Sequence, residues 1–526
     1  MKTIKYLACT ALVSLFCSCE NFLDREPIDF STPEDIATPS DILQAVNGTY
    51  RMLIYKPGDR LQPLTQDFMA DDGFCNDMNY GELLIWKGDQ TPDDERCVKD
   101  KWERDYAGIL RANTVLHYAP SIEGLEETLC KRYMAEAKFL RAYFYADLIE
   151  FYGDVPYRTE PEGMKKKISP RVSKETILYN ILLDLDEAAE DLPEKYDAAD
   201  YGRATKGAAY ALKARICLYN HLYDWCIEAC RNVMALDIYD LHPSYRELFT
   251  VAVEKTNKEY IFTQQFIQGK NSEGLSGIFW TKLSAYSAYQ ISHNLVEEFY
   301  MKSTGLRYDA PGSGYTNLSP YSDRDPRLLF NIKVEQNDMT GRNHTGYKAQ
   351  KFVDDAANPS GIHRDDEIDY PLIRYADVLL MLAEALVESG SYDYDEVVGL
   401  VDRIRQRSDV MMPTVGEAEG KDGHQLSQEE LRQVIRHERR VEFPLEGLRY
   451  SDIRRWEIGP EALTDCYAVV KITDDSDPEN PFSYYDKTVF MKRTFNTAKG
   501  YLWPIPAIEI QTNPMMNNPG YVGGPQ

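Results

Sequence analysis

Two stretches of about 34 residues, 205–236 and 375–407, constrain the fold more than any other feature of this chain. In each stretch, apolar and small residues recur at helical spacing, a short turn follows, and a second periodic run returns. The first run carries Ala208, Ala211, Leu212 and Ala214 in one copy, and Leu379, Leu382, Ala383 and Leu386 in the other. Helix pairs of this length indicate tetratricopeptide-like units, here separated by about 140 residues of different character.

Other parts of the chain show the same helical period. A first helix is expected to begin at Ser40 or Asp41, and residues 102–193 predict three more helices. One of these should end at Gly153 and the last at Pro193. Helix returns between Glu429 and Trp456. We therefore expect a mainly α fold, in which helix pairs form a curved scaffold.

Irregular regions interrupt the helices at residues 57–100 and 240–370. The first has Gly, Pro and Asp scattered through it, and the second is rich in Gly, Tyr, Asn and Asp and contains short β-like runs at 259–262 and 329–334. Residues 474–481 also read as irregular, and four prolines keep the C-terminal tail from being helical throughout. The irregular regions should form a loop-rich layer with a few short strands on the helical scaffold. Long loops of this kind are often functional.

The N-terminus has the features of a lipoprotein signal. Lys2 and Lys5 precede an apolar core from Tyr6 to Phe16, which is too short to span a bilayer, and the small residue Ser18 precedes Cys19. A cysteine at the first mature position accepts diacylglycerol, and the lipid would anchor the exported protein to a membrane. The alternative is an ordinary cleaved signal with a chance cysteine, because Phe stands where Leu is usual three residues before it.

Charge and cysteine content exclude several classes of function. The formal net charge of -26 argues against nucleic acid as a partner, since phosphate binding needs clustered Lys and Arg. Seven cysteines remain after signal removal and lipidation, and they show no paired CxxC spacing, so neither a zinc site nor a disulfide framework is indicated. Cys226 and Cys230 lie one helical turn apart and are expected to be buried.

No arrangement of residues favours catalysis. His437-Glu438 lacks the second histidine of a metalloprotease helix. Glu438, Glu442 and Glu446 could suggest the paired carboxylates of a glycosidase, but the nearby arginines predict a partly buried ion network instead. The acidic stretch 474–479 lacks the pattern of a calcium loop. We expect no catalytic residue, no metal and no cofactor.

Two segments in the irregular regions have the composition of a glycan-binding surface. Sugars present apolar C–H faces and a rim of hydroxyls, so they suit flat aromatic rings beside carboxylates and amides. The candidates in the first segment, 71–86, are Asp71, Asp72, Asn76, Asn79, Tyr80 and Trp86. Those in the second, 279–294, are Phe279, Trp280, Tyr286, Tyr289 and Asn294. The alternative is that these aromatics pack beneath their own loops. The remaining tryptophans, Trp102, Trp225, Trp456 and Trp503, are expected in the core.

Short blocks of residues follow one another in a characteristic order along the whole chain. They are Cys19 with Phe22-Leu23-Asp24; Trp102, Tyr106 and Arg111-Ala112-Asn113; Arg141-Ala142 with Tyr152-Gly153-Asp154-Val155-Pro156; Arg203-Ala204-Thr205-Lys206; Ile373-Arg374-Tyr375-Ala376; Glu438-Arg439-Arg440-Val441-Glu442; Glu446-Gly447-Leu448-Arg449-Tyr450; and Trp503-Pro504-Ile505-Pro506 with Asn518-Pro519-Gly520-Tyr521. In this order they resemble the SusD/RagB family of outer-membrane nutrient-binding lipoproteins from Bacteroidetes.

The resemblance implies a noncatalytic lid on a SusC-like, TonB-dependent transporter, with four tetratricopeptide-like helix pairs and an irregular face. Such proteins capture oligosaccharides at the cell surface and pass them to the transporter, and the family's ligand-contacting loops lie broadly in the two segments named above. Residues 1–18 would then be the signal, 19–39 a lipidated tether and 40–526 a single domain on the outer face of the outer membrane. Two alternatives stay open: a lid that binds peptides or glycopeptides, and a structural lid with little ligand affinity.

Overall fold

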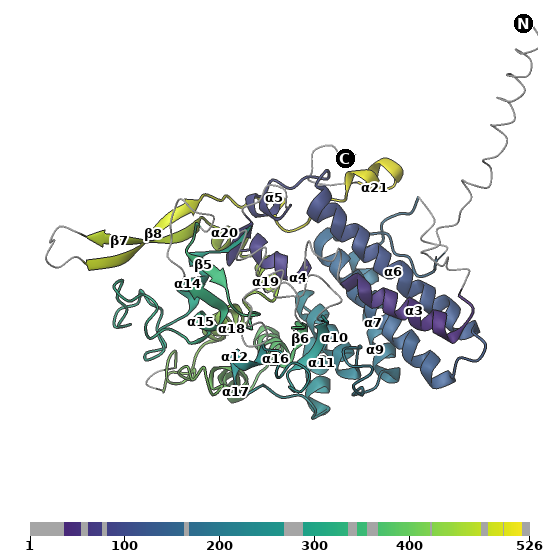
Figure 1. Cartoon of the computed structure of the whole chain (residues 1–526), viewed down its shortest axis with the longest axis horizontal. Coiled ribbons are helices and arrows are strands. Elements are labelled where there is room, and N and C mark those ends of the chain that lie inside the picture. The colour runs from purple at the N-terminus through teal and green to yellow at the C-terminus, as the bar shows by residue number, and fades with distance from the viewer. Residues whose placement is uncertain are drawn as a thin grey trace, which may run out of the picture.

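Stacked antiparallel helices form the frame of the molecule (Figure 1). The computed structural model describes residues 36–53, 62–75, 81–161, 168–267, 288–334, 344–354, 367–420, 423–474, 482–497 and 499–517. Among these residues helices predominate and the strands occur in four separate two-stranded pairs. The predicted mainly α fold is confirmed.

Four long helices begin the stack: α3 (Pro39–Tyr50), α6 (Asp100–Tyr118), α7 (Glu127–Tyr152) and α9 (Lys174–Asp191). They pack in that order, α3 on α6, α6 on α7 and α7 on α9. The first helix begins slightly earlier than predicted, because Thr38 forms a capping box with Asp41. Helix α7 ends where the sequence predicts, at Gly153, whose φ of 70° is accessible to glycine at little cost.

The two repeated stretches fold as predicted. The first gives α10 (Lys206–Tyr219) and α11 (Tyr223–Ala235), and the second gives α16 (Tyr375–Ser389) and α17 (Tyr394–Arg405). Helix α10 continues the stack from α9, and α11 packs directly on α16. The two copies are therefore neighbours in space, although about 140 residues separate them in the sequence.

Helix α18 (Gln428–Glu442) joins the helical stack to the irregular layer. Its consecutive residues Glu438, Arg439 and Arg440 enter three different groups of ion pairs. Glu438 pairs with two arginines, Arg439 with aspartates on α16 and α19 (Arg449–Arg455), and Arg440 with acids of the irregular layer. One helix thus holds three parts of the fold in register.

The largest of these groups, the central ion network, is buried and balanced in charge. Its five cations and five carboxylates are Arg327, Lys351, Arg374, Arg405, Arg407, Glu259, Asp325, Glu438, Glu442 and Glu446. The partly exposed Glu419 adds a further carboxylate at its edge. An ion network forms around Glu438, Glu442 and Glu446 as predicted, and it is more deeply buried than expected. The expected cation partners are wrong, because the arginines close by in the sequence, Arg439, Arg440, Arg449 and Arg455, pair with other acids.

Short elements make up the irregular layer. In the first irregular region these are α4 (Gln62–Gln66), the 3-10 turn η3 (Asp67–Met69), β1 (Gly73–Cys75), α5 (Glu82–Lys87) and the π turn η4 (Glu95–Lys99). In the second they are α12 (Tyr245–Leu248), β2 (Tyr260–Gln264), β3 (Tyr289–Ile291), α14 (His293–Glu298), α15 (Arg327–Asn331), β4 (Ile332–Val334), β5 (Tyr347–Ala349) and β6 (Tyr370–Arg374). The run 259–262 is a strand as predicted, whereas only the second half of 329–334 is one. Two 3-10 turns, η2 (Arg51–Leu53) and η5 (Ala119–Ser121), and two short helices, α20 (Gly459–Ala462) and α21 (Ala507–Thr512), complete the fold.

A long hairpin, β7 (Cys466–Asp474) and β8 (Phe482–Met491), was not predicted from the sequence. It projects from the body at the left of Figure 1. Its base packs on Phe74 and Trp86, through Cys466, Phe490 and Met491. The hairpin therefore rises beside strand β1.

Most predictions for the remaining tryptophans and cysteines are confirmed. Trp102 and Trp503 are buried and Trp456 is partly buried, but the assignment of Trp225 to the core is wrong, since this side chain is 46% exposed on α11. The seven cysteines of the described part are free, and Cys226 and Cys230 are buried as expected.

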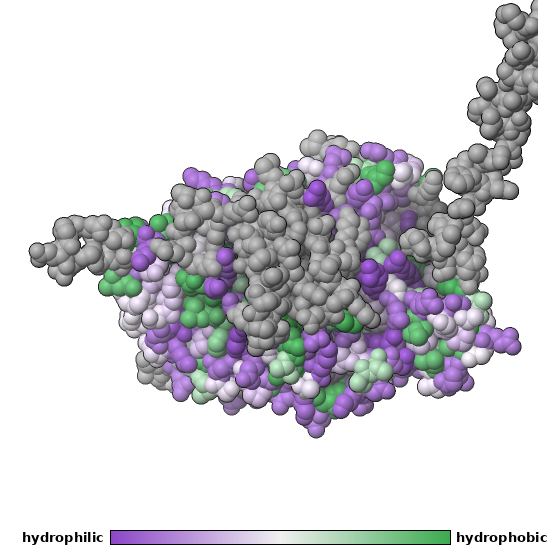
Figure 2. Space-filling view, viewed as in Figure 1, coloured by the Kyte–Doolittle hydropathy of each residue, from purple (hydrophilic) through white to green (hydrophobic). Residues whose placement is uncertain are grey.

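The visible face is mainly hydrophilic, with hydrophobic residues in small groups, as the strong net acidity suggests (Figure 2).

Candidate functional site

Strands β1 and β3 bring the two predicted ligand segments together. They pair antiparallel, with Gly73 opposite Ile291 and Cys75 opposite Tyr289. A Cβ on Gly73 would lie 2.6 Å from the carbonyl oxygen of Gln290, so the close approach of the two strands requires glycine here. Segments about 200 residues apart in the sequence thus share one small sheet.

Asp71 and Asp72 directly precede β1, and both are buried and paired with arginines. Arg449 donates to both carboxylate oxygens of Asp71 at 2.9 Å, and Arg440 lies 2.8 Å from Asp71 and 3.3 Å from Asp72. Burial opposes the charged form, but these guanidinium groups hold the pKa of Asp71 below its usual range. For Asp72, burial and the adjacent charge of Asp71 raise the pKa to about 6. Both carboxylates fix the position of β1.

Trp86 and Tyr289 also lie inside the protein in this structure, 1% and 3% exposed. Trp86 packs against Phe74, with ring centroids 6.2 Å apart, and the guanidinium of Arg493 lies 4.7 Å from its ring. The ring of Tyr289 lies 4.9 Å from that of Phe68. These two aromatics pack inside the protein, Trp86 beside Phe74 and Tyr289 beside Phe68, which is the alternative role that the sequence left open.

The other predicted ligand residues divide into two groups. Asn294 is described, and its side chain donates to the carbonyl oxygen of Asp465 at 3.0 Å, a contact that holds the base of the hairpin. The rest lie outside the described residues: Asn76, Asn79, Tyr80, Phe279, Trp280 and Tyr286. Their contact with a ligand stays a prediction, as does the lipid attachment at Cys19.

The described residues next to these segments converge on one region. Strand β5, which pairs with β4, also packs beside β3. Just before β5, the backbone N–H of His344 donates to the side-chain oxygen of Gln290 at 3.0 Å. The His344 ring stacks on Phe490 of the hairpin, with centroids 5.1 Å apart and planes 17° apart. His344 and Phe490 were missed from the sequence, because the hairpin that brings them together was missed.

A pair of buried acids lies beside the residues that follow strand β2. The carboxylate of Asp369 accepts from the backbone N–H of Phe266 at 3.1 Å, and the backbone N–H of Asp369 donates to Glu254 at 2.9 Å. Burial first, and then the charge of Asp369, raise the pKa of Glu254 to about 8. Burial likewise raises the pKa of Asp369 to about 7. At neutral pH this pair therefore retains proton occupancy.

The Glu254→Gln variant is expected to be more stable than the wild-type protein at pH 9 and nearly equal to it at pH 5. A carboxyl whose pKa is raised in the folded state contributes stability below its unfolded value of 4.5 that is lost as pH rises through about 8. Gln resembles the protonated form at every pH. Thermal unfolding followed by circular dichroism at both pH values checks this, with the exposed Glu247→Gln as control. A lower melting temperature for Glu254→Gln at pH 9 would contradict it.

No described helix is both long and apolar enough to cross a membrane. Groups of three or more His, Cys, Asp or Glu side chains arranged to hold a metal ion do not occur in the described part of the chain.

Two family models together match most of the chain. Residues 21–218 match a family model described as "Starch-binding associating with outer membrane", and residues 258–521 match the model of the SusD family. SusD-like protein P2 of Formosa agariphila is 25% identical over 99% of this chain and 100% of its own length.

Solved structures resemble the fold across most of its length. A SusD-like carbohydrate-binding protein from Bacteroides fragilis superposes with a TM-score of 0.79 at 25% identity, over 91% of this chain and 99% of its own. Surface glycan-binding protein A from Bacteroides thetaiotaomicron, in complex with laminarihexaose, shares the fold with a TM-score of 0.67 at 20% identity, over 92% of this chain and 100% of its own. Because residues 258–521 make up half of the chain and a relative aligns along its full length, the chain belongs to the SusD family.

Proposed function

We propose that this protein is a noncatalytic glycan-binding lipoprotein of the outer membrane, which captures oligosaccharide or polysaccharide and delivers it to a SusC-like TonB-dependent transporter. The observation that carries the proposal is the pairing of β1 with β3, which joins two segments of sugar-binding composition on one rigid support. The ion pairs of Asp71 and Asp72 fix that support. A preorganised base lowers the cost of ordering a binding surface.

The relatives point to the same class of ligand. One family model is described by starch binding and outer-membrane association, and the solved relatives include a carbohydrate-binding protein and a complex with laminarihexaose. Glycan binding at the outer membrane is therefore the coarse function favoured for this chain. Attachment through Cys19 and association with a transporter are finer parts of the proposal, and co-purification of a TonB-dependent barrel from solubilised membranes tests the second.

The structure changes which residues we propose as direct contacts. Asp71, Asp72, Trp86 and Tyr289 are buried and engaged with other side chains, so we assign them to positioning the site. The proposed contacts are then Trp280, Tyr286, Asn79 and Tyr80. Aromatic rings stack on the C–H faces of sugar rings, and amides and phenols bond to the hydroxyls.

Replacing Trp280 and Tyr286 by Ala together should weaken polysaccharide binding roughly tenfold or more, because stacked aromatics are the usual anchors of such surfaces. Retardation of the mature chain in gels cast with starch, laminarin and other polysaccharides measures this. Trp225→Ala is the matched control, since Trp225 is an exposed aromatic on α11 that lies outside the two segments.

Each outcome selects one function. Absence of retardation by every polysaccharide in a broad panel would contradict glycan binding. Competition by peptides but not by glycans would instead identify a peptide-binding lid. Normal transport with a variant that no longer binds glycan would indicate a structural lid, and release of reducing ends by pure protein would contradict the noncatalytic assignment.

A further inference from the structure

A group of tyrosines lies between the hairpin and the irregular residues 300–325. Its members, here called the tyrosine surface, are Tyr308, Tyr315, Tyr321 and Tyr485, and each is only partly buried. The rings of Tyr308 and Tyr315 have centroids 5.0 Å apart, and those of Tyr321 and Tyr485 are 5.8 Å apart. The segment between α14 and α15 carries three of the four and lies below the hairpin in Figure 1. Two distant parts of the chain thus bring four phenol rings together.

Arg324 fixes the tyrosine surface from beneath. Its buried guanidinium donates to three backbone carbonyl oxygens, 2.6–2.9 Å away, and has no carboxylate partner in the described part of the chain. It lies 5.4 Å from the ring centroid of Tyr308 and 5.9 Å from that of Tyr315. Because Arg324 is buried and the two rings are partly exposed, the guanidinium covers their inner side.

Two contacts attach the hairpin to this surface. The backbone N–H of Tyr485 donates to the carbonyl oxygen of Asn317 at 3.0 Å. The ammonium of Lys487 lies 2.8 Å from the carboxylate of Glu297, which also accepts from the hydroxyl of Tyr308 at 2.5 Å. The rings are therefore held in place before any ligand binds, which lowers the cost of ordering a binding surface.

Tyr315 and Tyr485 present hydroxyls that a ligand can reach. Neither hydroxyl has a hydrogen-bond partner in the described part of the chain, and neither is a buried atom. A phenol can both donate and accept a hydrogen bond, and its ring offers an apolar face. A partly exposed ring beside a free hydroxyl suits a sugar, which presents C–H faces and hydroxyls together.

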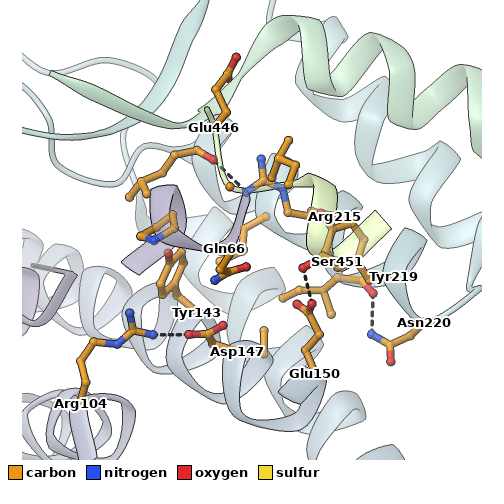
Figure 3. A pocket seen from close by; sticks show the side chains of 17 residues that line it. Gln66, Arg104, Tyr143, Asp147, Glu150, Arg215, Tyr219, Asn220, Glu446 and Ser451 are labelled. Atoms are coloured by element: carbon orange, nitrogen blue, oxygen red, sulfur yellow. Dashed lines mark hydrogen bonds and ion pairs between the residues drawn. The ribbon is translucent and has the colours of Figure 1, made fainter. Parts of the chain in front are cut away.

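The polar cavity inside the helical frame offers no equivalent contact (Figure 3). It measures about 90 Å³ and is lined by residues of α4, α6, α7, α10 and α19. Within its wall Arg104 pairs with Asp147, and Glu150 accepts from Ser451 at 2.5 Å. Because a space of this size admits no polysaccharide chain, a further glycan contact has to lie on the surface of the molecule.

We propose that the tyrosine surface is a second contact for a long glycan chain, beyond the two segments joined by β1 and β3. The rings of Tyr315 and Tyr485 stack on sugar faces, and their hydroxyls bond to sugar hydroxyls. The surface adjoins the candidate site, because the hydroxyls of Tyr321 and Tyr347 are 3.1 Å apart and β5, which contains Tyr347, packs beside β3. The inference rests on the proposed glycan binding and deepens it, since two linked contacts favour long chains over short ones.

The test compares a polysaccharide with its own trisaccharide. The polysaccharide is the one that retards the wild-type chain most in the panel of starch, laminarin and other polysaccharides, and the trisaccharide is titrated by ligand-observed NMR. The double variant Tyr315→Ala and Tyr485→Ala should bind the polysaccharide roughly tenfold more weakly and the trisaccharide as before, because the segments 71–86 and 279–294 hold a short chain alone.

Tyr179→Ala is the matched control, since Tyr179 is an exposed tyrosine on α9, within the helical stack. Should the double Ala variant fold poorly, Tyr315→Phe with Tyr485→Phe tests the same surface, because Phe keeps both rings and removes only the hydroxyls. It should weaken polysaccharide binding roughly threefold or more.

Failure of this inference and failure of the proposed function are distinguished. Polysaccharide binding that stays unchanged in both tyrosine variants overturns the inference alone. Equal losses for polysaccharide and trisaccharide would place these tyrosines in the first contact and also overturn it. Loss of a co-purified transporter with glycan binding intact would identify a protein contact and overturn it as well. If the wild-type chain binds no polysaccharide, the inference and the proposed function fail together.

Discussion

Replacing Arg374 by Met is expected to lower the free energy of unfolding by roughly 3–5 kcal/mol, because it removes one partner from a buried ion network and leaves carboxylates without compensation. Arg374 is buried at the end of β6. Its guanidinium lies 2.7 Å from Glu446 and 2.8 Å from both Glu259 and Glu442. The loss is a large share of the roughly 5–15 kcal/mol that stabilises a typical protein.

Urea unfolding followed by tryptophan fluorescence measures this loss. The matched control is Arg231→Met, which breaks the exposed pair between Arg231 and Glu396, 2.9 Å apart. An exposed pair contributes roughly 0–1 kcal/mol, so the control should stay close to the wild-type protein. Equal losses for the two variants would mean that the central ion network does not stabilise the fold.

The same network predicts how the effect depends on pH. Burial opposes ionisation of Glu442, but Arg407, Arg374 and Arg327 lower its pKa to about 2, from 4.5 when unfolded. The stability due to this carboxylate is present above pH 4.5 and is lost as pH falls towards 2. Without Arg374 the folded pKa rises, so the acid transition of Arg374→Met should begin at higher pH.

Elements with a strong local period were predictable. The repeated pairs α10–α11 and α16–α17 were found because small and apolar residues recur on one helix face. The carboxylates of the central ion network were expected because Glu438, Glu442 and Glu446 follow at four-residue spacing, but cations such as Arg327 and Arg374 lie far from them in the sequence. The helical period lies within the elements that it predicts, whereas the cation partners of these glutamates could not be read from neighbouring residues.

The hairpin was missed because its signal depends on distant partners. Strand β7 contains the apolar run Ala468, Val469 and Val470. This run lacks the alternation of apolar and polar residues that marks a strand with one buried face. β-branched and aromatic residues in β7 and β8 were the signal available, but only contact with Phe74 and Trp86 shows where the hairpin belongs.

Burial of the candidate site could not be read from the sequence for a similar reason. Asp71 and Trp86 lie in a polar, glycine-containing segment, which favours exposure. Their partners Arg449 and Arg493 follow more than 370 residues later. An acid with no cation nearby in the sequence looks solvated, although in the folded chain it is paired and buried.

Replacing Gly447 by Ala is expected to cost roughly 3 kcal/mol or more, through steric overlap and backbone strain combined. Gly447 has a φ of 76°, and a Cβ there would lie only 1.9 Å from the carbonyl oxygen of Pro63. That oxygen belongs to the backbone, so no side chain can rotate away. The backbone N–H of Gly447 also donates to Asp67 at 2.9 Å, which holds the turn before β1.

Gly390→Ala is the matched control, because Gly390 has nearly the same φ, 74°, and no atom within 4 Å of an added Cβ. It should lose only about 1 kcal/mol, the cost of a positive φ for a residue with a side chain. Thermal and urea unfolding measure the stability of the two variants. Similar losses of stability would show that overlap with the carbonyl oxygen of Pro63 is not what destabilises Gly447→Ala. Because Pro63 leads through α4 and η3 into β1, any Gly447→Ala protein that folds should also lose polysaccharide retardation, whereas Gly390→Ala should keep it.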